Sequence, residues 1–87
     1  MKHASHADIR NRLKRSNGHL QKVVEMLDEE RPCTQLAQQL HAVERAVSAA
    51  KKLLIQDHID HCLGQPPDNA EAHTAMIAEL REITRYL

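Results

Sequence analysis

The long stretch between Pro32 and Gly64 restricts the fold most, because it contains no other proline or glycine. Apolar residues recur within it at alternating intervals of four and three. They are Leu36, Leu40, Val43, Val47, Ala50 and Leu54. This spacing is typical of a helix whose seam packs on another helix. We expect one helix over residues 32–63, which packs on its own chain and also on a partner, since it is too long for one short neighbour.

Two further helical segments flank the long one. Residues 5–29 carry an apolar face, and Ser5 and Asp8 are typical of a helix start, with the Ser5 hydroxyl as the expected cap. Asp68 or Asn69 is expected to cap a third helix that extends to residue 87. No strand pattern occurs in the sequence. The sequence therefore predicts an all-α fold in a single domain, 1–87, with helices at about 5–29, 32–63 and 68–87.

The composition indicates a small domain that gains from association. The chain has 87 residues, with no Phe or Trp, so aliphatic side chains must build its core. Such a small domain buries a modest fraction of its surface, and oligomerisation buries more. No apolar run approaches the roughly 18 residues of a membrane span, and the start is polar. We expect a cytoplasmic protein that does not bind membranes, in which the two cysteines are free thiols or metal ligands.

Charge is unevenly distributed, although the formal net charge is zero. Residues 1–25 contain six Lys or Arg and two acidic residues, whereas residues 56–87 contain six acidic residues and two Arg. A basic first helix and an acidic third helix give the folded chain a positive face. By itself this pattern is also typical of an ordinary solvated helix surface.

Three residues have the chemistry of a metal site. His58 and Cys62 are four apart, and residues at this spacing share one face of a helix. Cys33 is the other cysteine, and a continuous helix places it about 37 Å from His58. It therefore cannot join His58 and Cys62 of its own chain at one metal ion. His61, His3 and His6 are possible extra ligands, whereas His19, His41 and His73 show no partner pattern and are read as surface residues.

Helix geometry suggests how the three ligands meet. Cys33, His58 and Cys62 fall within about 40° of one another on a helical wheel, along one edge of the seam. If two copies of the long helix pair antiparallel, the Cys33 end of one meets the His58 end of the other. Two-fold symmetry then creates two identical sites between subunits. We therefore expect an antiparallel helical-bundle dimer with a metal site at its interface.

Several stretches resemble the CsoR/RcnR family of metal-responsive and thiol-responsive bacterial repressors, over about residues 7–87. The similar stretches include residues 12–15, 18–20, 38–43 and 51–52, together with Cys33 and the segment 57–62. The resemblance implies an all-helical homodimer that assembles into a homotetramer, as a dimer of dimers. It also implies a transcriptional repressor that binds double-stranded operator DNA and releases it when an inducer binds between subunits, so that efflux or resistance genes are derepressed.

Carried over by position, the resemblance implies that Cys33, His58 and Cys62 bind Cu(I). Two thiolates and an imidazole suit this soft cation. Glu79 resembles the family's carboxylate that supports the histidine ligand, whereas Pro32 stands where a supporting tyrosine is usual. Nickel and cobalt sensors of the family add an N-terminal histidine, so Ni(II) or Co(II) is the alternative inducer.

The resemblance also implies DNA contacts, which belong to basic residues of the first two helices: Arg12, Lys14, Arg15, Lys51 and Lys52. Phosphate contacts and DNA shape are expected to carry the binding, which then weakens with salt. A metal-buffering helical protein is the less favoured alternative. The sequence shows no nucleophile–base pair and no phosphate-binding loop, so we do not expect an enzyme.

Overall fold

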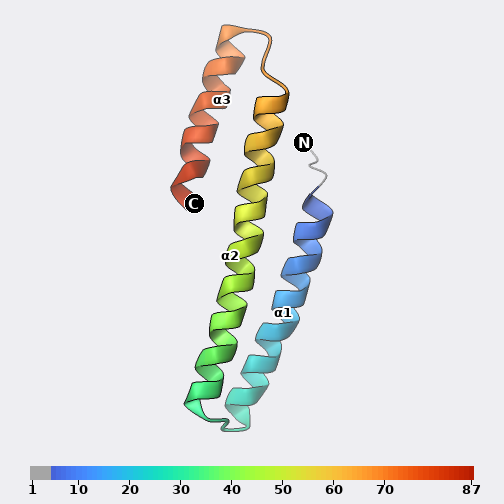
Figure 1. Ribbon diagram of the computed structural model, residues 1–87, viewed down its shortest axis with the longest axis vertical. Coiled ribbons are helices and arrows are strands. Elements are labelled where there is room, and N and C mark those ends of the chain that lie inside the picture. Colours follow the sequence, from blue (N-terminus) through green and yellow to red (C-terminus); the bar gives the residue numbers. More distant parts are fainter. Residues whose placement is uncertain (1–4) are drawn as a thin grey trace.

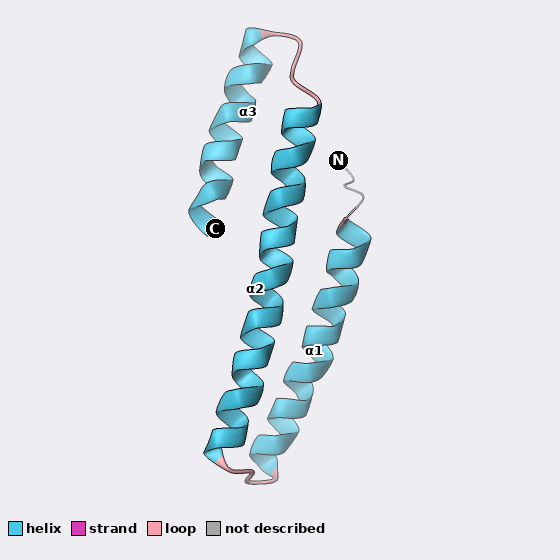
Figure 2. Ribbon diagram, viewed as in Figure 1, coloured by secondary structure: helices cyan, strands magenta, loops and turns pink. Residues whose placement is uncertain are grey.

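The computed structural model describes residues 5–87. Helix α1 comprises His6–Asp28, α2 comprises Cys33–Gly64, and α3 comprises Ala70–Ile83. A short 3-10 helix, η1, follows at Thr84–Tyr86. Figure 2 shows that the described residues form helices and loops without a strand. The all-α class predicted from the sequence is confirmed.

Helix α2 is the central element of an elongated molecule that measures 59 × 23 × 14 Å. Helix α1 runs antiparallel to it, and α3 turns back along its C-terminal half (Figure 1). Helix α3 contacts α2 much more sparsely than α1 does. Within residues 5–87, none of the helices is both long and apolar enough to cross a bilayer.

The helix starts differ in how well the sequence predicted them. Asn69 caps α3 as expected, because its Oδ1 accepts a hydrogen bond from the Ala72 N–H at 2.7 Å. The expected Ser5 cap of α1 is wrong: the Ser5 side chain makes no capping hydrogen bond. The Ser5 backbone already has helical angles (φ −77°, ψ −12°), whereas a capping residue normally has extended ones. Its carbonyl oxygen instead accepts from the Ile9 N–H at 2.9 Å.

The turn between α1 and α2 is tight and uses an unusual residue. Glu30 has a positive φ of 56°, which glycine adopts at lower cost. The Glu30 N–H donates to the Leu27 carbonyl at 3.1 Å, and the Arg31 N–H donates to the Met26 carbonyl, also at 3.1 Å. This pair of bonds is the Schellman arrangement, which satisfies the last carbonyl groups of a helix. It lets Pro32 lead directly into α2, with Cys33 as the first helical residue.

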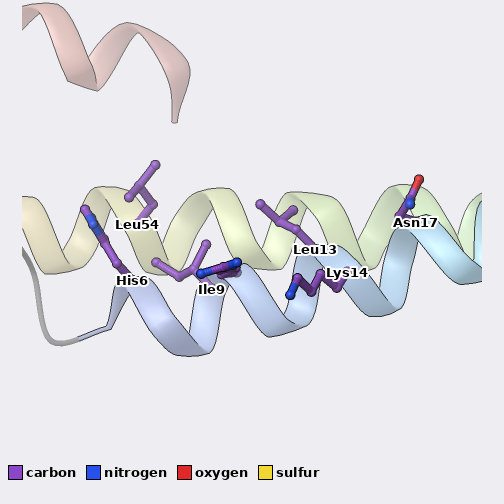
Figure 3. Close-up of a pocket in the computed structure, with 7 residues that line it drawn as sticks. His6, Ile9, Leu13, Lys14, Asn17 and Leu54 are labelled. Carbon is purple, nitrogen blue, oxygen red and sulfur yellow. The ribbon is translucent and has the colours of Figure 1, made fainter.

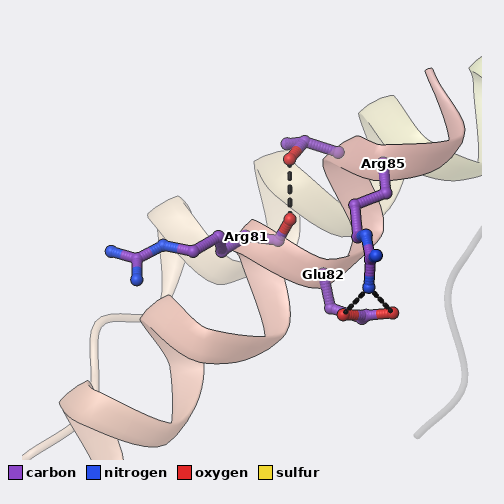
Figure 4. Close-up of polar contacts among 4 residues, drawn as sticks. Arg81, Glu82 and Arg85 are labelled. Carbon is purple, nitrogen blue, oxygen red and sulfur yellow. Dashed lines mark hydrogen bonds and ion pairs between the residues drawn. The ribbon is translucent and has the colours of Figure 1, made fainter.

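The C-terminal end is held by short-range contacts on the surface. The Thr84 Oγ1 donates to the Arg81 carbonyl at 2.8 Å, and the Arg85 guanidinium pairs with the Glu82 carboxylate at 3.1 Å (Figure 4). Exposed ion pairs of this kind stabilise a helix by only about 0.5 kcal/mol. Helix α3 ends sooner than expected, at Ile83 rather than at residue 87, because the last residues tighten into η1.

The core is a narrow line of small and medium side chains between α1 and α2. Its α1 members, Ile9, Ser16 and Val23, recur every seven residues and are all buried. Val43 and Ala50 of α2 lie on the same contact line and are also buried. Helices α1 and α2 therefore bury only a narrow part of each helix surface against each other.

The remaining half of the apolar seam is exposed. The exposed fraction is 43% for Val47 and 38% for Leu54. Val43 and Ala50, which alternate with them along the seam, are buried. Leu13 and Leu20 of α1, seven residues apart, are exposed by 44% and 41%, and Leu13 lines one groove with Val47 and Leu54. The long helix thus packs on α1 with one half of its seam and leaves the other half uncovered within the chain.

Candidate metal centre and nucleic-acid interface

His58, Cys62 and Glu79 form a polar cluster between α2 and α3. The Cys62 Sγ lies 3.6 Å from the His58 Nε2, as expected for residues one helical turn apart. The Glu79 Oε1 lies 3.1 Å from the same nitrogen. His58 is half-buried, Cys62 is buried, and Glu79 is largely exposed. The structure therefore brings together the predicted thiol, imidazole and supporting carboxylate.

The environment of Cys62 keeps its thiol protonated. Burial raises the pKa of Cys62 above its usual 9.0, and the negative charge of Glu79 raises it further. Since the thiolate is the form that binds metals, a metal ion must displace this proton. The raised pKa therefore favours the protonated thiol in the chain without metal.

Cys33 lies at the opposite end of the same helix and is exposed. The rise of an α-helix separates it from His58 by about 37 Å. Among residues 5–87 of one chain, no three Cys, His, Asp or Glu side chains are arranged to hold one metal ion, and in the cluster at His58 both Cys62 and Glu79 contact the same nitrogen. A single chain therefore supplies two adjacent donors and presents the third at its far end.

The other predicted donors occupy different places. His6 lies at the start of α1, near Leu54 of α2, and lines a groove with it (Figure 3). His61 is half-buried on α2. His3 lies outside the described residues. Because Leu54 precedes His58 by one helical turn, the start of α1 is close to the His58 end of α2.

Two grooves flank the α1–α2 contact line, on either side of Ser16. The basic groove is lined by Arg12, Arg15, Ser16, His19, Ala46 and Ala49. The apolar groove comprises two adjoining sections, lined by His6, Ile9, Arg10, Leu13, Lys14, Asn17, Val47, Ala50, Lys51 and Leu54. At about 100° per residue, Arg12 and Leu13 must leave α1 on opposite sides of its buried stripe.

The predicted DNA-binding residues divide between these grooves. Arg12 and Arg15 line the basic groove. Lys14 and Lys51 line the apolar groove, beside Leu13 and Val47 respectively. Lys52 is exposed on α2. The structure thus brings the two arginines together and places the two lysines at the edge of the uncovered apolar surface.

Sequence reasoning misjudged His19. We read it as a surface residue without a partner, but it is half-buried, and its Nε2 lies 2.6 Å from the Gln39 Oε1. This hydrogen bond joins α1 to α2 at the basic groove. The sequence spacing could have indicated this position, because His19 follows Arg15 by one helical turn and both residues project from one side of α1.

Comparison with known proteins identifies the family. The profile of the family described as metal-sensitive transcriptional repressor matches residues 5–86. The chain belongs to this family. The resemblance predicted from the sequence is thereby confirmed. Its named relatives are transcriptional regulators rather than enzymes.

Both copper and nickel regulators resemble this member of the metal-sensitive transcriptional repressor family. The copper-sensing transcriptional repressor CsoR of Mycobacterium ulcerans is 33% identical over 60% of this chain and 44% of its own length. The CsoR of Bacillus subtilis is 31% identical over 86% of this chain and 73% of its own. The chain thus spans less than half of the first relative. The nickel-responsive transcriptional regulator InrS is a structural neighbour, with a TM-score of 0.82, 31% identity, and coverage of 100% of this chain and 98% of that one.

Proposed function

We propose that the protein is a cytoplasmic metal-responsive transcriptional repressor. It binds double-stranded operator DNA without metal and is released when a metal ion binds at an intersubunit site. Cys33 of one subunit and His58 and Cys62 of another are its ligands. The observation that carries this proposal is the contact of His58 with Cys62 at one end of α2 while Cys33 is exposed at the other. Release then derepresses genes of metal efflux or resistance.

The uncovered half of the seam supports the dimer that this site needs. Large apolar side chains share this flank of the α1–α2 pair and are each more than a third exposed. They are Leu13, Leu20, Val24, Leu40, Val47 and Leu54. Exposed apolar patches of this kind mark protein–protein contacts. Antiparallel pairing of two α2 helices over this flank brings Cys33 of one to His58 of the other. Two such dimers would form the homotetramer.

Cu(I) is the inducer that the donor set favours. Two thiolates and one imidazole form a soft, low-coordinate site, which suits Cu(I) better than harder divalent ions. Glu79 supports the site, because a carboxylate that contacts the imidazole orients the ring. The relatives named as copper-sensing repressors are in keeping with this choice.

Ni(II) or Co(II) is the second candidate, and the position of His6 favours it. His6 lines the same groove as Leu54, one turn before His58. His6 is then a candidate fourth donor, as is His3 by its position in the sequence, and His61 is a further candidate nitrogen ligand on α2. The structural neighbour InrS is a nickel-responsive regulator. A harder, higher-coordinate ion needs such an additional nitrogen ligand.

DNA binding is assigned to the basic residues of α1 and α2, which act mainly on backbone phosphates. These residues are Arg12, Lys14, Arg15, Lys51 and Lys52. An oligomer of this chain is also neutral overall, so the local grouping of these cations has to attract the DNA. A metal that ties two α2 helices together changes their relative position, and so the spacing between the basic surfaces of the subunits. Such coupling typically amounts to about 1–3 kcal/mol.

Anaerobic fluorescence anisotropy on the DNA upstream of the protein's own gene tests the proposal. We expect binding without metal and release by Cu(I), and Cys62→Ala is expected to bind DNA but to resist release. Release by Ni(II) alone would select the second candidate, with loss of the response in His6→Ala. Absence of DNA binding at low salt would overturn the repressor and favour a metal-buffering protein. Unchanged metal stoichiometry in Cys33→Ala would overturn the intersubunit site.

A further inference from the structure

We propose that the basic groove is a binding site for one backbone phosphate of DNA, and that His19 is a phosphate-binding residue held in place by Gln39. This inference rests on the proposed DNA binding and adds a residue to it. The observation behind it is the grouping of Arg12, Arg15 and His19 in one groove, with the imidazole fixed to α2.

The hydrogen bond between the helices pre-organises the imidazole. The His19 Nε2 lies 2.6 Å from the Gln39 Oε1, and the pair is partly buried. Nε2–H donates to the amide oxygen, so the other ring nitrogen, Nδ1, is the one available to a ligand. Because the ring is already held, less conformational entropy is lost when a ligand binds.

The groove has the charge and the shape that a phosphate requires. Arg12 and Arg15 line it from α1, and the N–H donors of a guanidinium match phosphate oxygens. The Arg12 Nε donates to the exposed Asp8 carboxylate at 3.1 Å, so the terminal N–H groups of Arg12 are its phosphate donors. The α2 wall consists of Ala46 and Ala49, whose short side chains leave room for the ligand. A phosphate beside His19 favours the doubly protonated imidazole, which then donates from Nδ1 to a phosphate oxygen. DNA binding is thus coupled to uptake of a proton by His19.

The groove lies where DNA can reach it in the dimer. The apolar groove lies on the other flank of the contact line and is the surface assigned to the second subunit. Ala46 and Val47 are neighbours in sequence, yet they line different grooves. Covering the apolar flank therefore leaves the arginines and His19 accessible.

The ionisable residues that line this groove are few, which makes the test specific. Arg12 and Arg15 come from α1, where the Asp8 carboxylate pairs with Arg12 at 3.1 Å, and the α2 residues Gln39, Ala46 and Ala49 do not ionise. Among the described residues that line it, His19 is therefore the one with an imidazole, which can take up a proton when a phosphate binds.

The experiment compares the full-length wild type with His19→Gln, Gln39→Ala and, as a matched control, His73→Gln on exposed α3. Affinity for operator DNA and for unrelated DNA is measured by anisotropy against salt and pH. We expect His19→Gln to bind both DNAs about tenfold more weakly at about pH 6, with a salt slope that is shallower by about 0.9 for each phosphate that His19 neutralises in the wild type. Gln39→Ala should weaken binding less and keep the pH dependence, whereas His73→Gln should resemble the wild type.

Each outcome decides the inference separately from the proposed function. If His19→Gln has the wild-type salt slope and pH dependence while the wild type binds DNA, the proposed phosphate site is wrong and the proposed repressor function is retained. If the affinity of His19→Gln for DNA falls with no change in the salt slope or pH dependence, His19 only stabilises the packing of α1 on α2 and the inference also fails. If the wild type does not bind DNA, the proposed function itself is overturned. Helical content by circular dichroism and unchanged metal affinity identify variants that are properly folded.

Discussion

The Glu79 Oε1 of α3 lies 3.1 Å from the His58 Nε2 of α2, and this contact joins two helices that otherwise touch sparsely. A carboxylate here stabilises the tautomer that carries the proton on Nε2 and fixes the orientation of the ring. The orientation of the His58 ring therefore depends on the position of α3, and we expect metal binding by His58 to depend on it as well.

Replacing Glu79 with Gln should weaken metal binding by about 10–100-fold, the usual effect of removing such a supporting group. The substitution also removes one cause of the raised pKa of Cys62, which by itself favours metal binding. Burial is the larger cause and remains, so we expect the effect at His58 to dominate. Competition with a chromogenic Cu(I) chelator measures the affinity. Glu82→Gln on the same helix is the control, and equal affinities for the two variants would contradict the role of Glu79.

The raised pKa of Cys62 should appear as a dependence of stability on pH. The folded chain retains the thiol proton at a pH where the unfolded chain, with a pKa of about 9.0, releases it. Protons are then bound more tightly by the folded state, so the free energy of unfolding falls as pH rises above the unfolded pKa. Urea unfolding of the reduced, metal-free protein at about pH 8 and pH 10 should show a larger loss of stability for the wild type than for Cys62→Ala. Identical losses would argue against the shift.

Glu30→Gly should stabilise the protein by about 1 kcal/mol. Glu30 occupies the left-handed region at φ 56°, where a side chain is unfavourable and glycine is the usual residue of a Schellman turn. Thermal unfolding with a fixed protein concentration measures the gain. The matched control is Glu29→Gly, where φ is −82° and where the exposed ion pair with Arg31 is removed, so destabilisation is expected. A lower melting temperature for Glu30→Gly would refute the argument.

Adjacent residues of α2 should separate oligomerisation from DNA binding. Val47→Glu places a charge in the apolar groove and should shift the oligomer toward monomer, with loss of intersubunit metal binding. Ala46→Glu places the same charge in the basic groove, where it repels DNA phosphates, and should leave the oligomer intact. Sedimentation velocity and DNA anisotropy provide the two measurements. The assignment of the two flanks fails if both variants dissociate, or if Ala46→Glu retains full affinity for DNA.

Much of the fold follows from local sequence patterns. The uninterrupted stretch after Pro32 predicts α2, and Asn69 predicts the start of α3, because capping and helix breaking depend on near neighbours. The i, i+4 spacing likewise predicts that His58 and Cys62 meet, which the distance of 3.6 Å confirms. Ser5 failed as a cap because its backbone angles are already helical.

The sequence by itself determined the helices and the pairing of His58 with Cys62, since these depend on contacts within one or two helical turns. Only the tertiary structure decided which half of the seam is buried, because Val43 and Val47 are equally apolar and α1 covers just one of them. The contact of His19 with Gln39 was likewise decided by helix packing, whereas that of His58 with Glu79 was implied by the family resemblance and not by any local pattern. Each joins residues about 20 positions apart, whose meeting depends on how two helices are rotated against each other.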